Sequence, residues 1–174
     1  PARAERSLRR ACLLMLLGPG VVPAEEPPFS LDPPPGLRAA PVARAASGNT
    51  YTWLPADLSQ PTRLMLTIMP ASEVRARLGE FRPAQCLRLF LDELRHDHAH
   101  FFAVEQSAPL TLGEARLARV RWTGDRHGRE LTGVLACGAE QDHYYVVHYV
   151  DALARAPRSF VEIRAALASF TPRP

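Results

Sequence analysis

The chain has 174 residues and 21 basic side chains, all of them arginine, against 18 acidic ones. Residues 1–24 contain four of these arginines and one acid, so the remaining chain is formally neutral. Its charge therefore gives no basis for a nucleic-acid partner or for adhesion to an anionic membrane. About 150 residues suit one domain with a single hydrophobic core.

The first 24 residues have the three-part layout of a secretory signal peptide. Arg9 and Arg10 form a basic start, an apolar run covers 11–17, and small residues precede a cleavage site after Ala24. Seven apolar residues are far fewer than the roughly 20 that cross a bilayer as a helix. We therefore expect an exported, periplasmic protein whose mature part has no membrane span.

Two cysteines remain after this segment, Cys86 and Cys137. In an oxidising compartment such an even pair predicts a disulfide, here one that would join a helix to a strand. The alternative is two separate buried thiols, because free cysteine packs as a small hydrophobe. No Cys-x-x-Cys motif points to a redox enzyme.

Residues 25–48 are rich in proline and predict an extended entry segment, in which Phe29–Leu31 adds a short edge strand. Alternating side chains then predict strands over Asn49–Leu54 and Thr62–Met69, each closed by a proline. In the second strand, Leu64, Leu66 and Ile68 alternate with the outward set Arg63, Met65 and Thr67.

Two helices are expected in the middle of the chain. Ser72 precedes a short segment that Gly79 ends, which predicts a capped turn or two of helix. Pro83 opens a longer helix whose apolar residues recur at helical spacing, namely Leu87, Phe90, Leu91 and Leu94.

The second half predicts mainly strands. Phe101–Glu105 looks like a strand, and Pro109 with Gly113 marks a turn. An antiparallel meander should follow, with strands over Arg116–Thr123, Glu130–Cys137 and His143–Val150. Ser159 should cap a last helix with one apolar stripe, formed by Phe160, Ile163, Leu167 and Phe170.

These elements predict an α+β domain over residues 49–171. We expect an antiparallel sheet of five to seven strands with two main helices packed on it, shielding its apolar face.

The order of these elements resembles the PsbP-like family, which includes the periplasmic DcrB-like proteins. The resemblance depends on Leu31-x-x-Pro-x-Gly36, a strand ending at Pro55, the mid-chain helix, and a terminal helix with Phe160-x-x-Ile163-x-x-x-Leu167-x-x-Phe170. It implies a PsbP-like fold and a non-enzymatic accessory, assembly or binding role. Some members are lipid-anchored, whereas this chain lacks the lipid-acceptor cysteine. The resemblance carries over no catalytic residue.

A cluster of histidines is the most site-like stretch. In an extended segment His96, His98 and His100 would share one face, and three imidazoles with an open fourth position suit zinc or copper. The alternative is a solvated helix C-terminus, where histidine interacts favourably with the helix dipole. No His-Glu-x-x-His or zinc-finger spacing supports a metal.

No motif predicts an enzyme or a phosphate site. The serines lack a Gly-x-Ser-x-Gly elbow, and the glycines form neither a Gly-x-Gly-x-x-Gly nor a Walker pattern. We therefore expect no catalytic activity and no resident cofactor beyond the metal hypothesis.

A binding surface is the remaining hypothesis. Arg119 and Arg121 interleave with Trp122, and Tyr145 follows in a neighbouring strand; arginine, tryptophan and tyrosine dominate binding hot spots. The same aromatic residues could equally be core.

The favoured function is an exported accessory or binding protein of the bacterial cell envelope. It would engage a protein or a small amphiphile through its sheet face or a helix–sheet groove. The alternatives are a periplasmic metal-binding protein and an immunity or inhibitor protein against an envelope-targeting enzyme. The sequence indicates no oligomeric state.

Overall fold

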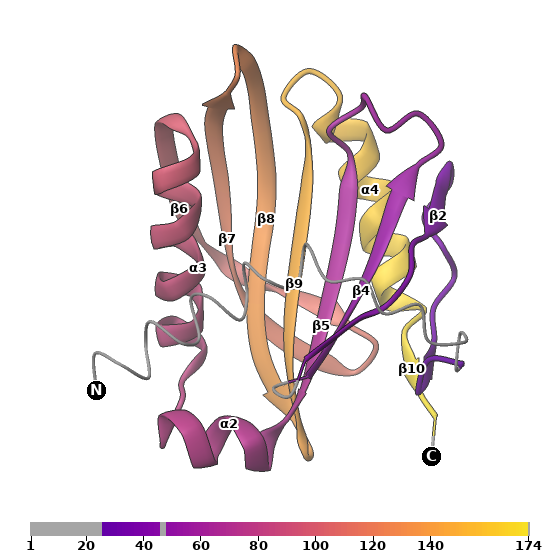
Figure 1. Cartoon of the computed structure of the whole chain (residues 1–174), viewed down its shortest axis with the longest axis vertical. Coiled ribbons are helices and arrows are strands. Elements are labelled where there is room, and N and C mark those ends of the chain that lie inside the picture. Colours follow the sequence, from indigo (N-terminus) through magenta and orange to yellow (C-terminus); the bar gives the residue numbers. More distant parts are fainter. Residues whose placement is uncertain (1–25, 46–47, 174) are drawn as a thin grey trace.

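A computed structural model describes residues 26–45 and 48–173 of the chain (Figure 1). The predicted signal peptide, residues 1–24, lies outside these residues. Within them, no helix combines the length and the apolar character needed to cross a bilayer. The elements, in chain order, are β1 (Phe29–Ser30), β2 (Leu37–Ala39), β3 (Ala43–Ala45), β4 (Gly48–Pro55), β5 (Arg63–Pro70), α2 (Ala71–Leu78), α3 (Pro83–Asp97), β6 (Ala99–Leu112), β7 (Ala115–Arg126), β8 (Arg129–Glu140), β9 (His143–Ala152), α4 (Ala156–Ala168) and β10 (Thr171–Pro172).

One large antiparallel sheet dominates the fold. It has eight strands in the order β2-β4-β5-β9-β8-β7-β6, with β3 also paired to β4. The α+β class with an antiparallel sheet is therefore confirmed, although the sheet is wider than the five to seven strands predicted. The Pro-rich entry segment supplies β2 and β3. Phe29 and Ser30 do not extend this sheet, because β1 pairs with β10 at the chain's other end.

Both faces of the sheet are covered, which corrects the prediction of a single shielded face. Helix α3 packs on β8, β7 and β6, while α4 contacts β9 and β6 from the other side (Figure 1). Strands β8 and β9 are buried along most of their length because they lie between these two layers. Two separate hydrophobic clusters result, one under α3 and one under α4.

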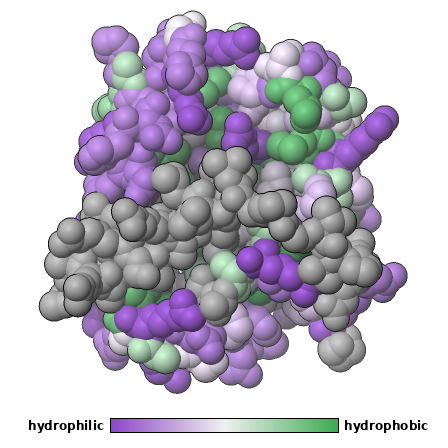
Figure 2. Space-filling model, viewed as in Figure 1, coloured by the Kyte–Doolittle hydropathy of each residue, from purple (hydrophilic) through white to green (hydrophobic). Residues whose placement is uncertain are grey.

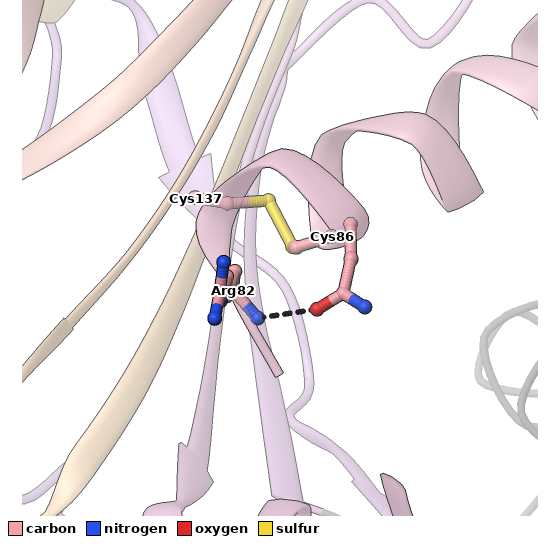
Figure 3. The surroundings of a disulfide bond; sticks show 4 residues. Arg82, Cys86 and Cys137 are labelled. Atoms are coloured by element: carbon pink, nitrogen blue, oxygen red, sulfur yellow. Dashed lines mark hydrogen bonds between the residues drawn. A yellow bond between two sulfur atoms is a disulfide. The ribbon is translucent and has the colours of Figure 1, made fainter. Parts of the chain in front are cut away.

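Helix α3 begins as predicted at Pro83. The Arg82 backbone N–H donates to the Gln85 side-chain oxygen at 2.8 Å, so a side chain of the first turn pairs the backbone N–H that precedes the helix. One residue later, Cys86 forms a disulfide with Cys137 of β8, with Cα atoms 6.2 Å apart (Figure 3). The predicted cysteine pair thus joins the first turn of α3 to the centre of the sheet.

Three local predictions are wrong, each for a visible reason. Ser72 does not cap α2, because the helix already begins at Ala71 and Ser72 lies inside its first turn. Ser159 lies inside the first turn of α4, where its hydroxyl serves another contact described below. Pro109 lies within β6 near a register shift, an irregularity that accommodates a residue without an N–H.

Candidate ligand-binding cavity

A cavity of about 690 Å³ lies between α3 and the part of the sheet that α3 does not cover. It borders β4, β5 and β9 on one side and α2 and α3 on the other. Ligand sites usually measure about 300–1,000 Å³, so this space is large enough for a small organic molecule. Seen from the direction of Figure 1, hydrophobic surface on this side of the molecule is framed by hydrophilic side chains (Figure 2).

The alternation of β5 builds the sheet wall of this cavity. Leu64 and Leu66 are fully buried in the cluster under α4, so the residues between them face the opposite side. Arg63, Met65 and Thr67 therefore line the cavity. These are the residues that the sequence pattern placed on an outward face.

Aromatic rings form the cavity floor. Trp122 is 1% exposed, and its ring centroid lies 5.0 Å from that of His98 and 5.8 Å from that of His148. His98 Nδ1 lies 2.8 Å from the Leu94 carbonyl, so this nitrogen carries the hydrogen and donates it. The register explains the grouping, because Trp122 pairs with Gly133 and His148 pairs with Leu135, two residues further along the same face.

Two polar atoms of this floor have no hydrogen-bond partner in the described structure, Trp122 Nε1 and His148 Nε2. Both are shielded from solvent. Buried polar groups are nearly always paired, so unpaired ones mark a place that is strained or functional. Burial, together with the charge of Arg63 and the neighbouring His98, lowers the pKa of His148 to about 3. The imidazole is therefore neutral near pH 7.

One end of the cavity carries positive charge. Arg63 begins β5, and Arg126 and Arg129 face each other across the β7–β8 turn; all three line the cavity. Burial and then the charge of Arg126 lower the pKa of Arg63. Glu93 and Asp97 line the opposite wall, on α3.

Two loops are tied together over this charged end. An Arg129 guanidinium N–H donates to the Ser59 carbonyl at 2.8 Å, which joins the β7–β8 turn to the loop between β4 and β5. Arg155 donates to the Gln60 side chain at 2.7 Å and so holds the same loop from the other side. Ser59 and Gln60 both line the cavity.

A buried carboxylate organises the contacts behind this loop. Asp151 is 0% exposed, and it accepts hydrogen bonds from Thr62 at 2.8 Å, from Ser159 at 2.6 Å and from Arg155 at 2.6 Å. Burial alone raises the pKa of Asp151, but these hydrogen bonds outweigh it and the net pKa is lowered. Burial raises the pKa of Tyr149, which also donates to Asp151. The cluster connects β5, β9 and α4.

The three histidines of the metal hypothesis do not share one face. His96 is exposed near the end of α3, with Nδ1 2.7 Å from the Asp92 carbonyl, while His98 is buried beside Trp122. His100 is exposed in β6, at a register shift and with φ at 50°. Within residues 26–45 and 48–173, no group of three histidine, cysteine or acidic side chains is placed to hold a metal ion.

The four predicted contact residues are divided between the two faces. Trp122 lies on the cavity side, under α3. Arg119 is half-buried on the α4 side, where burial and then the charge of Arg164 lower its pKa, and Arg121 is exposed on that side. Tyr145 is buried there against Phe170, with ring centroids 5.7 Å apart. These side chains therefore do not form one surface.

The cavity itself was not predicted from the sequence. One signal was present, because β8 and β9 read as almost continuous apolar runs, Leu131–Cys137 and Tyr144–Val150. Such runs are typical of strands covered on both faces. They would have predicted that the side of Trp122 and His148 is also an interior.

The fold and the cavity define the class: a small α+β domain with a ligand-sized hollow on one face of an antiparallel sheet. No family model and no curated protein matches the chain. Among solved structures, it is similar to LpqN, which is involved in cell envelope biogenesis of Mycobacterium tuberculosis, with 16% identity, a TM-score of 0.53, and coverage of 84% of this chain and 83% of that one. PA94 of Pseudomonas aeruginosa, a protein of unknown function, is 13% identical over 79% of this chain and 98% of its own, but its TM-score of 0.43 does not establish a shared fold. The likeness to LpqN supports the fold, and the PsbP-like label is not confirmed.

Proposed function

We propose that this chain is a non-enzymatic binding protein of the bacterial cell envelope that holds a small amphiphile in the cavity between α3 and the sheet. The observation that carries the proposal is the cavity's composition. Apolar atoms form most of its wall, and three arginines line one end. Ligand pockets commonly combine an apolar lining with a few placed polar groups.

The apolar lining comes from both layers. Met65 and Val146 contribute from the sheet, and Phe81, Phe90 and Leu94 contribute from the helical layer. Methionine is flexible and polarizable, which suits a hydrocarbon chain of variable shape. An alkyl group in this space would lose contact with water without the protein having to expose a core residue.

The envelope location is supported by three features. The first 24 residues match a secretory signal, and LpqN, which has a similar fold, is involved in cell envelope biogenesis. A disulfide between Cys86 and Cys137 also fits an oxidising compartment. These features support a periplasmic location.

The experiment is a titration of the purified chain with N-phenyl-1-naphthylamine, an uncharged probe that fluoresces in apolar sites. Met65→Trp places a larger ring in the cavity and should weaken binding by at least about tenfold, as steric exclusion costs more than 1.4 kcal/mol. Val161→Trp is the matched control, because Val161 is 67% exposed on α4 and far from the cavity lining.

Saturable binding that Met65→Trp abolishes and Val161→Trp preserves would support the proposal. Binding that neither variant changes would place the probe elsewhere and refute the cavity as the site. Native mass spectrometry of the chain from the envelope fraction adds a second test. A bound mass that disappears on denaturation would identify the natural ligand by its size.

A further inference from the structure

The positive charge at the cavity end is concentrated on the sheet side. Arg63, Arg126 and Arg129 come from the start of β5 and from the β7–β8 turn, which lie at the same end of the sheet. Their proximity is electrostatically significant, because the charge of Arg126 contributes to the lowered pKa of Arg63. Three guanidinium groups that line the same end of a cavity offer it hydrogen-bond donors and no acceptor.

Arg63 is the informative member of this group. Its side chain is half-buried, and the described residues give it neither a hydrogen bond nor an ion pair. A partly buried cation without a partner is less well solvated than it would be in water. An anion bound beside it would offset that loss of solvation with charge-assisted hydrogen bonds, which guanidinium groups form in bidentate geometry.

The acidic residues of the cavity do not neutralise Arg63. Glu93 and Asp97 belong to α3, on the opposite wall, and neither forms an ion pair with an arginine of the described chain. Arg129 uses one N–H for the Ser59 carbonyl and keeps its other donors. Trp122 adds an unpaired N–H on the floor, in the same cross-strand row as Arg63.

The other end of the cavity has no lining arginine among the described residues. Met69, Val74 and Phe81 line it, and Met69 is six residues from Arg63 along β5, or about 20 Å at the rise of an extended strand. Charge at one end and hydrocarbon contacts at the other fit a molecule with the same polarity. The two ends of the cavity therefore differ in polarity.

We infer that the ligand is an amphiphile with an acidic headgroup, a carboxylate or a phosphate. The headgroup binds Arg63 with help from Arg126 and Arg129, and the alkyl chain extends along β5 toward Met69. This inference rests on the proposed function, since it assigns the headgroup chemistry of the same cavity.

The test uses matched pairs of ligands that compete with N-phenyl-1-naphthylamine. Palmitic acid is compared with hexadecanol at pH 8, and palmitoyl lysophosphatidic acid with monopalmitoylglycerol, so that each pair shares its chain length. In the pair whose headgroup fits the cavity, the acidic ligand should bind about 10- to 100-fold more tightly than the neutral one. This is the range expected for charge-assisted hydrogen bonds. The pair with the larger ratio distinguishes a carboxylate from a phosphate headgroup.

Arg63→Gln should reduce this ratio to less than about threefold while the neutral ligand binds as before. Arg119→Gln is the matched control, because Arg119 is also a partly buried strand arginine but lies on the α4 side. It should leave the ratio unchanged. If Arg63→Gln fails to fold in a thermal melt, Arg126→Gln takes its place, since Arg126 is exposed and should also lower the ratio.

The outcomes separate the two proposals. If neutral and acidic ligands bind equally well, the headgroup assignment is overturned while the binding function stands. The headgroup assignment is also overturned if the folded Arg63→Gln protein keeps the same ratio of affinities for acidic and neutral ligands. The same holds for folded Arg126→Gln where that variant is used instead. If no amphiphile displaces the probe, or if the probe does not bind, the proposed function itself is overturned.

Discussion

His148 is buried in its neutral form, so the folded state should lose stability at acidic pH. Its pKa is held at about 3, against an ordinary value of 6.5, because burial and the charge of Arg63 oppose protonation. In the unfolded chain the same imidazole takes up a proton below about pH 6.5. The unfolded state therefore binds more protons between pH 6.5 and 3, and stability must fall as the pH falls through that range.

The size of the effect follows from the two pKa values. Linkage between pKa values of 6.5 and about 3 gives a loss of about 2 kcal/mol between pH 7 and pH 5. Part of the ring borders the cavity, so we take this figure as an upper bound and expect about 1–2 kcal/mol. For a domain of this size that corresponds to a drop in Tm of about 2–8 °C.

The assay is urea unfolding at pH 7 and pH 5, monitored by circular dichroism. His148→Phe keeps a flat ring without a titrating group and should remove most of the loss. His127→Gln is the control, because His127 is exposed in the β7–β8 turn and should leave the loss in place. If His148→Phe shows the same loss as the unaltered chain, the buried imidazole is not its cause and the reasoning is refuted.

Three further changes test the packing around the site. Asp151→Ala should lower the free energy of unfolding by about 3–5 kcal/mol in urea, since it leaves several buried donors without their acceptor; a loss below about 1 kcal/mol would show that solvent replaces the carboxylate. Replacing Cys86 and Cys137 with alanine should lower the free energy of unfolding by up to about 4 kcal/mol in the same assay, because the disulfide closes a loop across 51 residues. The intact mass of the unaltered chain should be lower than that of the reduced chain by two hydrogen atoms. Gly133→Ala should lower the Tm by several degrees in a thermal melt, because a Cβ there would lie 2.2 Å from the Tyr149 carbonyl; an unchanged Tm would contradict this packing.

Periodicity predicted the elements that depend on local pattern. The apolar spacing of Leu87, Phe90 and Leu94 after Pro83 defines a helix that the structure confirms, and the meander strands follow with small shifts at their ends. These predictions are correct because each element is determined by residues within a few positions of one another. The same limit explains Ser159, whose predicted capping role is displaced by the distant Asp151.

The apolar runs of β8 and β9 indicate a second covered face, but the position of the cavity on that face could not be predicted because it depends on where the helices lie relative to the sheet. Alternation divided Leu64 and Leu66 from Arg63 and Met65 correctly, but it could not show that the second face is also enclosed. Trp122 was selected as a contact residue with Arg119 and Arg121, yet strand geometry sends alternate residues to opposite faces. Helix α3, which comes from a different part of the chain, decides which of these faces holds a cavity.

The distribution of polar contacts argues that the cavity has a function. On the α4 side, Asp151 has a partner for each oxygen, as stability demands. On the α3 side the disulfide fixes the first turn of the helix, while buried nitrogens of Trp122 and His148 lack partners beside a hollow; among the described residues, Arg119 Nε is the one such atom on the α4 side. A sequence selected for stability alone would fill the hollow with larger apolar side chains or pair these groups. Two unpaired nitrogens on the cavity floor, next to an end lined by three arginines, are what a binding site for a polar headgroup requires, and packing alone does not account for them.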